Sequence, residues 1–349
     1  MNNRIIFVDY LKAFAIFLVC YGHAIQGLHH DDTFWVNPMF CIIYSFHMPL
    51  FFFLSGFFIK KAIDIESISV FFYKKFLSLI LPFLSWIFIT FLIEKIFNVK
   101  IMSGHWKSYL WFLRTLFICQ LILFSLLKIY QKNSIICYVL VLLLIFFPKS
   151  SRYCFYTFFI FLGYIVSCKY EIIRKYREML LCMSVILFIF FIPYFKGNYY
   201  QEWMNFVVVS GSRINIIFSV RSLLIIGYRI FIGTLGSIIL FLLFMGLENV
   251  KNLLTDFFVN IGRNTLGIYI LQTLILEKLL VNFINLQVIQ VASSYKMLFI
   301  YNSICFVVAI CAMFLSYFMV FILSKNSLLG FLLFGKKDKE NAFKKNTIF

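Results

Sequence analysis

Residues 7–28 read FVDYLKAFAIFLVCYGHAIQGL, and this stretch decides the class of fold. Its length and apolar character suit a helix that crosses a bilayer, which needs about 20 residues. A signal peptide is excluded because the run is too long for a signal h-region, Asp9 and Lys12 interrupt it, and no small-residue cleavage site follows it. We therefore expect a retained membrane helix that carries Asp9, Lys12 and His23 within an apolar sequence.

The whole chain shares this apolar character. Hydrophobic residues make up 63% of its 349 residues and charged residues 13%, whereas soluble domains have about 45–50% and about 25%. This composition excludes a soluble globular enzyme, a disordered chain and a secreted disulfide scaffold. The long apolar runs also differ from the short alternating segments of a membrane barrel. The predicted fold class is all-α, a polytopic helical membrane protein with about ten transmembrane helices.

The expected helices follow the apolar runs. They lie near residues 7–28, 38–59, 76–93, 108–127, 134–147, 153–168, 179–195, 222–247, 265–281 and 297–323. The sequence shows no internal repeat and no linker between domains, so one transmembrane domain is predicted over 1–324, followed by a basic tail over 325–349. The long external segment 196–221 is a candidate re-entrant piece or substrate lid.

The positive charge of the chain indicates topology. There are 32 Lys and Arg against 14 Asp and Glu, a formal net charge of +18. Cytoplasmic loops of membrane proteins accumulate these cations, and an N-terminus inside puts roughly twice as many of them in cytoplasmic as in external segments. Both termini are therefore predicted cytoplasmic. We expect a multi-pass protein of the bacterial cytoplasmic (inner) membrane, with membrane lipid and no nucleic acid as a partner.

Neither a disulfide framework nor a metal site is predicted. The nine cysteines are an odd number without a CxxC pair, and they lie in or beside apolar runs. His29, His30, Asp31 and Asp32 are a possible metal cluster, but adjacent ligands face apart, so a solvated turn is the better interpretation. The sequence does not indicate an oligomeric state.

The first helix carries the strongest functional signal. Lys12 and His23 are eleven positions apart, which is three turns plus about 20° and about 16 Å along the axis, and Asp9 lies within about 60° of that line. Ionisable residues inside a membrane are energetically expensive, so this stripe is a candidate site. Asp9 and Lys12 could instead form an i, i+3 pair at the membrane boundary.

The second helix adds a histidine near the external membrane boundary, where His23 is also expected. It begins around FHMPLFFFLSGFF, residues 46–58, which contains His47 and Ser55. The loop between the two helices is short, so His23 and His47 are expected to lie close together on adjacent helices. Two neighbouring imidazoles suit a general base and its orienting partner. His47 could alternatively cap the entry of its helix.

Five segments, taken in order, resemble one known family. These are DYLKAFAIFLVCYGHA (9–24), YSFHMPLFFFLSGFF (44–58), YLWFLRTLF (109–117), YRIFIGTLG (228–236) and IGRNTLGIYILQ (261–272). They are similar to the acyltransferase 3 family of integral membrane O-acyltransferases, and within it to the fucose 4-O-acetylase-like branch. The chain departs from that pattern with Lys12 and Ser78 where members often have Arg, and with Gln272 where many have His.

The resemblance implies an acyl-CoA-dependent O-acetyltransferase. Its donor would be cytoplasmic acyl-CoA, usually acetyl-CoA, as a co-substrate with no bound cofactor. Its acceptor would be a sugar hydroxyl of a cell-envelope or exported polysaccharide, or of a lipid-linked precursor. The alternative is a transporter or flippase of a lipid-linked sugar, although the paired broken helices of inverted repeats are not evident.

Roles follow for the polar residues within the helices. The predicted catalytic residues are His23, as general base for the sugar hydroxyl, with Lys12 and Asp9. The predicted donor-binding residues are Lys74, Lys75, Arg114 and Arg229. The predicted substrate or support residues are His47, Ser55, Trp111, Tyr269 and Gln272. Glu277 and Lys278 are interpreted as boundary residues at the end of their helix.

Overall fold

The computed structural model describes residues 5–28, 32–97, 110–130, 133–143, 150–203, 207–210, 213–216, 219–250, 253–279 and 295–336. The first half contains α1 (Ile6–Leu28), η1 (Asp32–Val36), α2 (Pro38–Phe57), α3 (Ile59–Ile65), α4 (Ile68–Lys75), η2 (Phe76–Ile80), α5 (Leu81–Phe97), α6 (Trp111–Ile129), α7 (Ser134–Leu143) and α8 (Ser151–Cys168). The second half contains α9 (Tyr170–Lys175), α10 (Arg177–Phe191), η4 (Ile192–Tyr194), η5 (Gly197–Gln201), β1 (Val207–Ser210), β2 (Arg213–Ile216), α11 (Val220–Met245), α12 (Leu253–Arg263), α13 (Thr265–Gln272), η6 (Thr273–Leu279), α15 (Tyr295–Leu323) and α16 (Ser327–Phe334).

The predicted helical membrane fold is confirmed. Among the described residues, eight helical segments are long and apolar enough to cross a membrane, and Thr265–Glu277 is a shorter apolar segment. Each of the ten predicted runs coincides with a helix, but α7 is described over only ten residues. The count of ten spans and the cytoplasmic position of both termini stay predictions. One short antiparallel hairpin, β1 with β2, interrupts the helices inside the segment 196–221.

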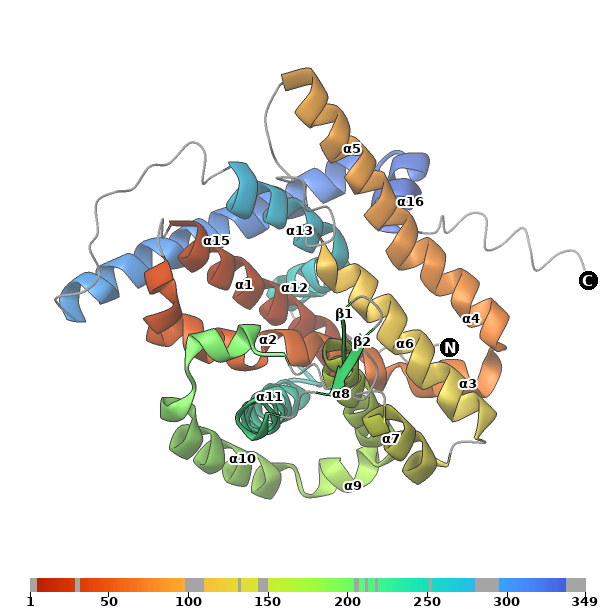
Figure 1. The fold of residues 1–349 in the computed structure, drawn as a ribbon. Helices are drawn as coiled ribbons and strands as arrows, with labels where there is room; N and C mark the ends of the chain where they lie inside the picture. The colour runs from red at the N-terminus through yellow and green to blue at the C-terminus, as the bar shows by residue number, and fades with distance from the viewer. Residues whose placement is uncertain are drawn as a thin grey trace, which may run out of the picture.

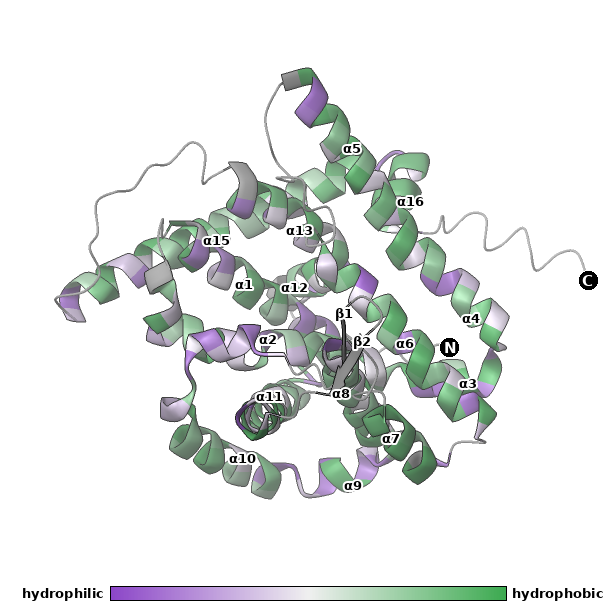
Figure 2. Ribbon diagram, in the orientation of Figure 1, coloured by the Kyte–Doolittle hydropathy of each residue, from purple (hydrophilic) through white to green (hydrophobic). Residues whose placement is uncertain are grey.

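Helices α1 and α2 form the centre of the molecule, and α5, α10 and α15 lie along its edge (Figure 1). In the most apolar window of each candidate span, 78% of the residues around α2 are buried but only 6% of those around α10. The outer helices are also largely apolar (Figure 2). Apolar side chains on the outside are stable where the surrounding solvent is lipid, so this arrangement agrees with a membrane protein.

Helix α2 begins at a clear local signal. The side chain of Asn37 accepts hydrogen bonds from the backbone N–H groups of Met39 and Phe40, and Pro38 occupies the first helical turn. This is an effective helix start because Asn satisfies N–H groups that have no partner within the helix, while Pro has no N–H to satisfy.

Glycines allow α2 to approach α8 closely. A Cβ atom on Gly56 would lie 1.9 Å from the carbonyl oxygen of Ile160, and one on Gly163 would lie 1.9 Å from the carbonyl oxygen of Phe53. Any larger side chain at either position would therefore push the two backbones apart. Such contacts between small residues are a main source of helix association in lipid.

The region after residue 324 begins with a packed helix. In α16, the carbonyl oxygen of Leu333 accepts a hydrogen bond from the indole Nε1–H of Trp86 on α5, at 3.0 Å. Gly335, with φ of 64°, ends α16 against the backbone of Ser78. The predicted basic tail therefore starts as part of the helical bundle, and its residues 337–349 lie outside the described part of the chain.

Candidate active site

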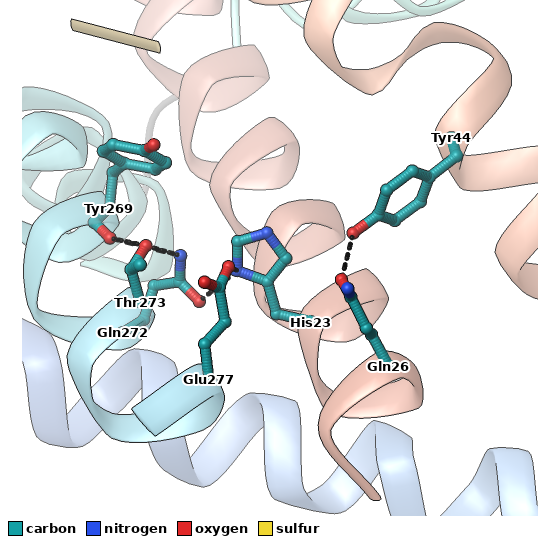
Figure 3. A network of polar contacts seen from close by, with 7 residues as sticks. All are labelled: His23, Gln26, Tyr44, Tyr269, Gln272, Thr273 and Glu277. Atoms are coloured by element: carbon teal, nitrogen blue, oxygen red, sulfur yellow. Dashed lines mark hydrogen bonds and ion pairs between the residues drawn. The ribbon is translucent and has the colours of Figure 1, made fainter. Parts of the chain in front are cut away.

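His23 lies at the centre of a polar network near the end of α1 (Figure 3). Its Nδ1 atom is 3.0 Å from Oε1 of Gln272 and 3.2 Å from Oε1 of Glu277. Both oxygens are acceptors, so Nδ1 carries the proton in the neutral ring. The lone pair of the neutral imidazole is then on Nε2, which is the arrangement required of a general base.

The orientation of Gln272 follows from its own partners. Its Nε2 group donates to the backbone carbonyl of Tyr269 at 3.1 Å and to Oγ1 of Thr273 at 3.0 Å, while Thr273 Oγ1 donates to the same carbonyl at 2.8 Å. Both amide hydrogens are therefore used away from His23. The remaining oxygen of the fully buried Gln272 faces the imidazole, which fixes the ring tautomer.

A π-helix brings Gln272 and Glu277 to the same nitrogen. In a regular α-helix, residues five apart point about 140° away from each other. Here η6 is a π-helix from Thr273 to Leu279, and its i→i+5 hydrogen bonds bring residues five apart onto one face. This is why a residue interpreted as a boundary glutamate contacts the histidine.

His47 is buried in α2. Its Nδ1 is 2.9 Å from the backbone carbonyl of Ile43, one turn earlier in α2, so this nitrogen donates to its own helix. The ring lies 4.5 Å from that of Tyr44, whose hydroxyl donates to Oε1 of Gln26. The partners of His23 Nδ1 are Gln272 and Glu277, and the pairing of His23 with His47 stays a prediction.

Lys12 and Asp9 lie at the other end of α1. Lys12 Nζ is 3.9 Å from Oδ1 of Asp9 and 4.7 Å from the centre of the Phe58 ring. The i, i+3 pair that the sequence allowed is therefore present. Asp9 is 3% exposed, and the close contact of its backbone with Gly262 shows that α12 covers it.

A cavity of about 250 Å³ extends from this end of α1 to Tyr269, and His23, Gln272 and Glu277 are not among the residues that line it. It is lined by Lys12, Ile16, Val19, Met48, Phe51, Leu54, Ser55, Phe58, Lys75, Leu79, Phe112, Leu116, Gln120, Thr265, Leu266 and Tyr269. On α1, the lining positions 12, 16 and 19 form one helical face, and position 23 is the next on that face. The cavity therefore follows the stripe predicted from the sequence and points toward His23.

Two rings meet at the His23 end of the cavity. The rings of Phe112 and Tyr269 contact each other edge to face, with their centres 5.3 Å apart. The backbone carbonyl of Tyr269 is the group that accepts hydrogen bonds from Gln272 and Thr273. Tyr269 thus contacts both the cavity and the network around His23, and its supporting role stays a prediction.

The predicted donor-binding cations do not share one location. Lys75 lines the cavity together with Lys12. Lys74 points elsewhere, because its Nζ is 2.6 Å from Oε1 of Glu66 and the side chain is 46% exposed. Arg114 is half-buried on α6 and is not among the residues that line the cavity.

Arg229 lies in an aromatic cluster at the His23 end. Its guanidinium donates to the backbone carbonyl of Glu202 and lies 4.5 Å from the ring of Trp203. The guanidinium of Arg152 lies over the same ring at 5.1 Å and over that of Trp111 at 5.6 Å. Trp111 precedes Phe112 on α6, so these groups are near the end of the cavity opposite Lys12 and Lys75.

The segment 196–221 contributes to this cluster. The Tyr200 ring on η5 lies 5.7 Å from the Arg229 guanidinium and is stacked on His47. Burial raises the pKa of the Tyr200 phenol, so the hydroxyl is protonated at neutral pH and is available as a donor. The Tyr200 ring of this segment and the Arg229 guanidinium of α11 therefore surround the same region as His47.

Sequence reasoning missed Glu277, Gln120, Arg152 and Trp203. Gln120 could have been recognised from the sequence, because a glutamine within the apolar run of α6 stands out. Arg152 and Trp203 follow segments without clear periodicity, so the sequence offered no comparable signal for them. No group of three metal-ligating side chains occurs in the part of the chain that the structure describes. The possible cluster at His29, His30 and Asp31 lies outside that part.

A family model described as an acyltransferase domain matches residues 5–324 of the chain. Over 87 residues, the chain is 40% identical to Nodulation protein NolL of Mesorhizobium japonicum and 38% identical to Nodulation protein NolL of Sinorhizobium fredii. Each match covers 24% of this chain, and the chain spans 23% and 24% of the lengths of these two curated relatives. No solved structure matches the chain.

Proposed function

Since the chain belongs to this acyltransferase family and is an integral membrane protein, we propose that it transfers an acyl group from acyl-CoA to a sugar hydroxyl. The acyl group is most simply acetyl. The acceptor is a cell-envelope or exported polysaccharide or its lipid-linked precursor, the location is the bacterial cytoplasmic membrane, and the branch is the fucose 4-O-acetylase-like one. The observation that carries the proposal is His23, bound through Nδ1 by Gln272 and Glu277 in a network that Tyr269 links to the cavity.

The reaction needs one residue that acts first as a general base and then as a general acid. A sugar hydroxyl is a weak nucleophile, so Nε2 of His23 removes its proton while the oxygen attacks the thioester carbonyl carbon. The bond between that carbon and sulfur then breaks, and the imidazolium returns the proton to the departing thiolate. The products are an ester and free CoA thiol. Glu277 stabilises the imidazolium between these two proton transfers.

The cavity suits the arm of the donor. Lys12 and Lys75 stand at one end, where they can pair with the phosphates of CoA. The largely apolar walls suit the methylene groups of pantetheine, and the 11-residue spacing from Lys12 to His23 corresponds to about 16 Å along α1. With the N-terminus in the cytoplasm, as predicted from the charge distribution, the donor enters from the cytoplasm.

The aromatic cluster at the other end suits the acceptor. Rings such as those of Trp111 and Trp203 offer flat apolar faces to a sugar, and arginine supplies several N–H donors in a fixed geometry. We therefore assign Arg229 to the acceptor side, whereas the sequence suggested a role in binding the donor.

The test follows labelled acetyl groups. Purified protein in nanodiscs is incubated with labelled acetyl-CoA and envelope glycan, and alkali-labile ester is measured on the glycan. We expect ester with the wild type and a decrease of about 10²- to 10⁴-fold for His23→Ala. Cys182→Ser, a change at an exposed residue of α10, is the control and retains the wild-type rate.

Two outcomes contradict the proposal. Unchanged ester formation in His23→Ala would remove the general-base assignment. Counter-flow of a lipid-linked sugar without any ester would identify the protein as a transporter.

A further inference from the structure

Gln120 is a buried polar residue of the cavity wall. It is 3% exposed, and it lines the cavity between Leu116 on its own helix and the residues of α2 and η2. Its Oε1 atom has no hydrogen-bond partner among the described residues. An amide oxygen in that state destabilises the folded protein by about 1–3 kcal/mol, so its presence requires an explanation.

Three other polar side chains of the cavity, those of Ser55, Lys12 and Lys75, have neighbours that they contact. The hydroxyl of Ser55 donates to the backbone carbonyl of Phe52 at 2.8 Å. Lys12 is close to Asp9, and the Lys75 ammonium lies 5.3 Å from the Phe71 ring. Gln120 therefore differs from them, since its buried amide oxygen has no hydrogen-bond partner among the described residues.

The position of Gln120 fits one part of the proposed donor. On α6, Phe112, Leu116 and Gln120 line the cavity at successive turns, so Gln120 lies about 12 Å along the axis from the rings nearest the His23 network. The opposite end carries the two lysines. A ligand that extends from these cations along α6 toward Phe112 would lie beside Gln120, and pantetheine contains two amide groups between its phosphate and its sulfur.

We propose that Oε1 of Gln120 accepts a hydrogen bond from an amide N–H of the pantetheine arm of the donor. This assignment rests on the proposed function and deepens it. It makes the cavity selective for thioesters carried on an amide-containing arm, because only such an arm satisfies the buried oxygen. An apolar acyl chain would fill the same space and leave Gln120 without a partner.

The experiment measures binding to the full-length protein in nanodiscs by calorimetry. The probes are CoA and adenosine 3′,5′-bisphosphate, which keeps the nucleotide and lacks the arm. The variant is Gln120→Met, which has a similar volume and no acceptor amide, with Gln120→Leu as a second version. Ser125→Ala, which changes a polar residue of α6 that does not line the cavity, is the matched control.

We expect Gln120→Met to weaken CoA binding by about 5- to 30-fold and to leave binding of the bisphosphate unchanged. In turnover, KM for acetyl-CoA rises by a similar factor while kcat changes little. The unliganded variant has a higher melting temperature than the wild type, because an unsatisfied buried amide has been removed. A purely structural role for Gln120 would give the opposite change in melting temperature.

Two results overturn the assignment and differ from each other. If the wild type binds CoA and Gln120→Met binds it equally well, Gln120 does not contact the arm and the proposed function stands. If the wild type binds no CoA, the proposed donor itself is wrong.

Discussion

Replacing Glu277 by Gln separates the charge at the His23 network from its geometry. The carboxylate oxygen of Glu277 lies 3.2 Å from Nδ1 of His23. Glutamine has nearly the same shape and can still accept a hydrogen bond from Nδ1–H, so the ring tautomer is preserved. What is lost is the attraction between the carboxylate and the imidazolium that forms when the base accepts a proton.

The size of this attraction follows from the distance and the exposure. Two unit charges 3.2 Å apart interact with about 5 kcal/mol at an effective dielectric constant of about 20. The Glu277 side chain is 31% exposed and that of His23 is 13% exposed, so solvent screening reduces the net value to about 1–2 kcal/mol. Because the imidazolium forms only during the reaction, kcat should fall about 5- to 30-fold.

The assay is the rate of acetyl ester formation at saturating donor and acceptor. The binding constant for CoA should not change, because Glu277 does not line the cavity. Glu178→Gln is the matched control, since it makes the same chemical change at a 75% exposed carboxylate beside Arg177. Its kcat should equal that of the wild type.

Two results would refute the reasoning. An unchanged kcat in Glu277→Gln would mean that the carboxylate does not stabilise the transition state. A loss as large as that of His23→Ala would mean that Glu277 itself transfers the proton and that its role is not electrostatic.

Two further predictions concern the donor end and the helix packing. Lys75→Ala should raise KM for acetyl-CoA about 5- to 10-fold at low salt, and less at high salt because of screening, whereas Lys74→Ala at the exposed ion pair should have little effect; equal effects of the two lysines would contradict this. Gly163→Ala should destabilise the protein by about 1–3 kcal/mol, since its Cβ would lie 1.9 Å from a backbone oxygen of α2. In a melting experiment Gly227→Ala is the control, because nothing lies within 4 Å of its Cβ, and equal melting temperatures for the two variants would count against close packing of α2 and α8.

The sequence was sufficient for the helices and for the stripe on α1. Apolar runs report membrane helices directly, because a bilayer demands about 20 apolar residues in succession. The 11-residue spacing of Lys12 and His23 depends only on helical geometry, and the structure places the cavity along that same face. Both inferences rest on local rules that apply whatever the neighbouring helices are.

These local rules could not predict the partners of His23. The regular α-helical period puts Glu277 on a different face from Gln272, and the π-helix that corrects this is a product of tertiary packing. The adjacent residues Lys74 and Lys75 look equivalent in the sequence, yet one pairs with Glu66 at the surface and the other lines the cavity. Sequence order gave no way to choose between them.

The contact between the rings of Phe112 and Tyr269 also affects how well the protein insulates the two sides of the membrane electrically. The cavity hollows the protein on one side of these rings, so the insulating layer between the two aqueous phases is thinner there than the hydrocarbon core of about 30 Å. A membrane voltage falls mainly across the thinnest insulating layer, and moving one elementary charge through 100 mV is worth about 2.3 kcal/mol. If His23 carries the proton of the proposed reaction, that proton moves beside this layer, and we expect part of the membrane voltage to act on the proposed acyl transfer.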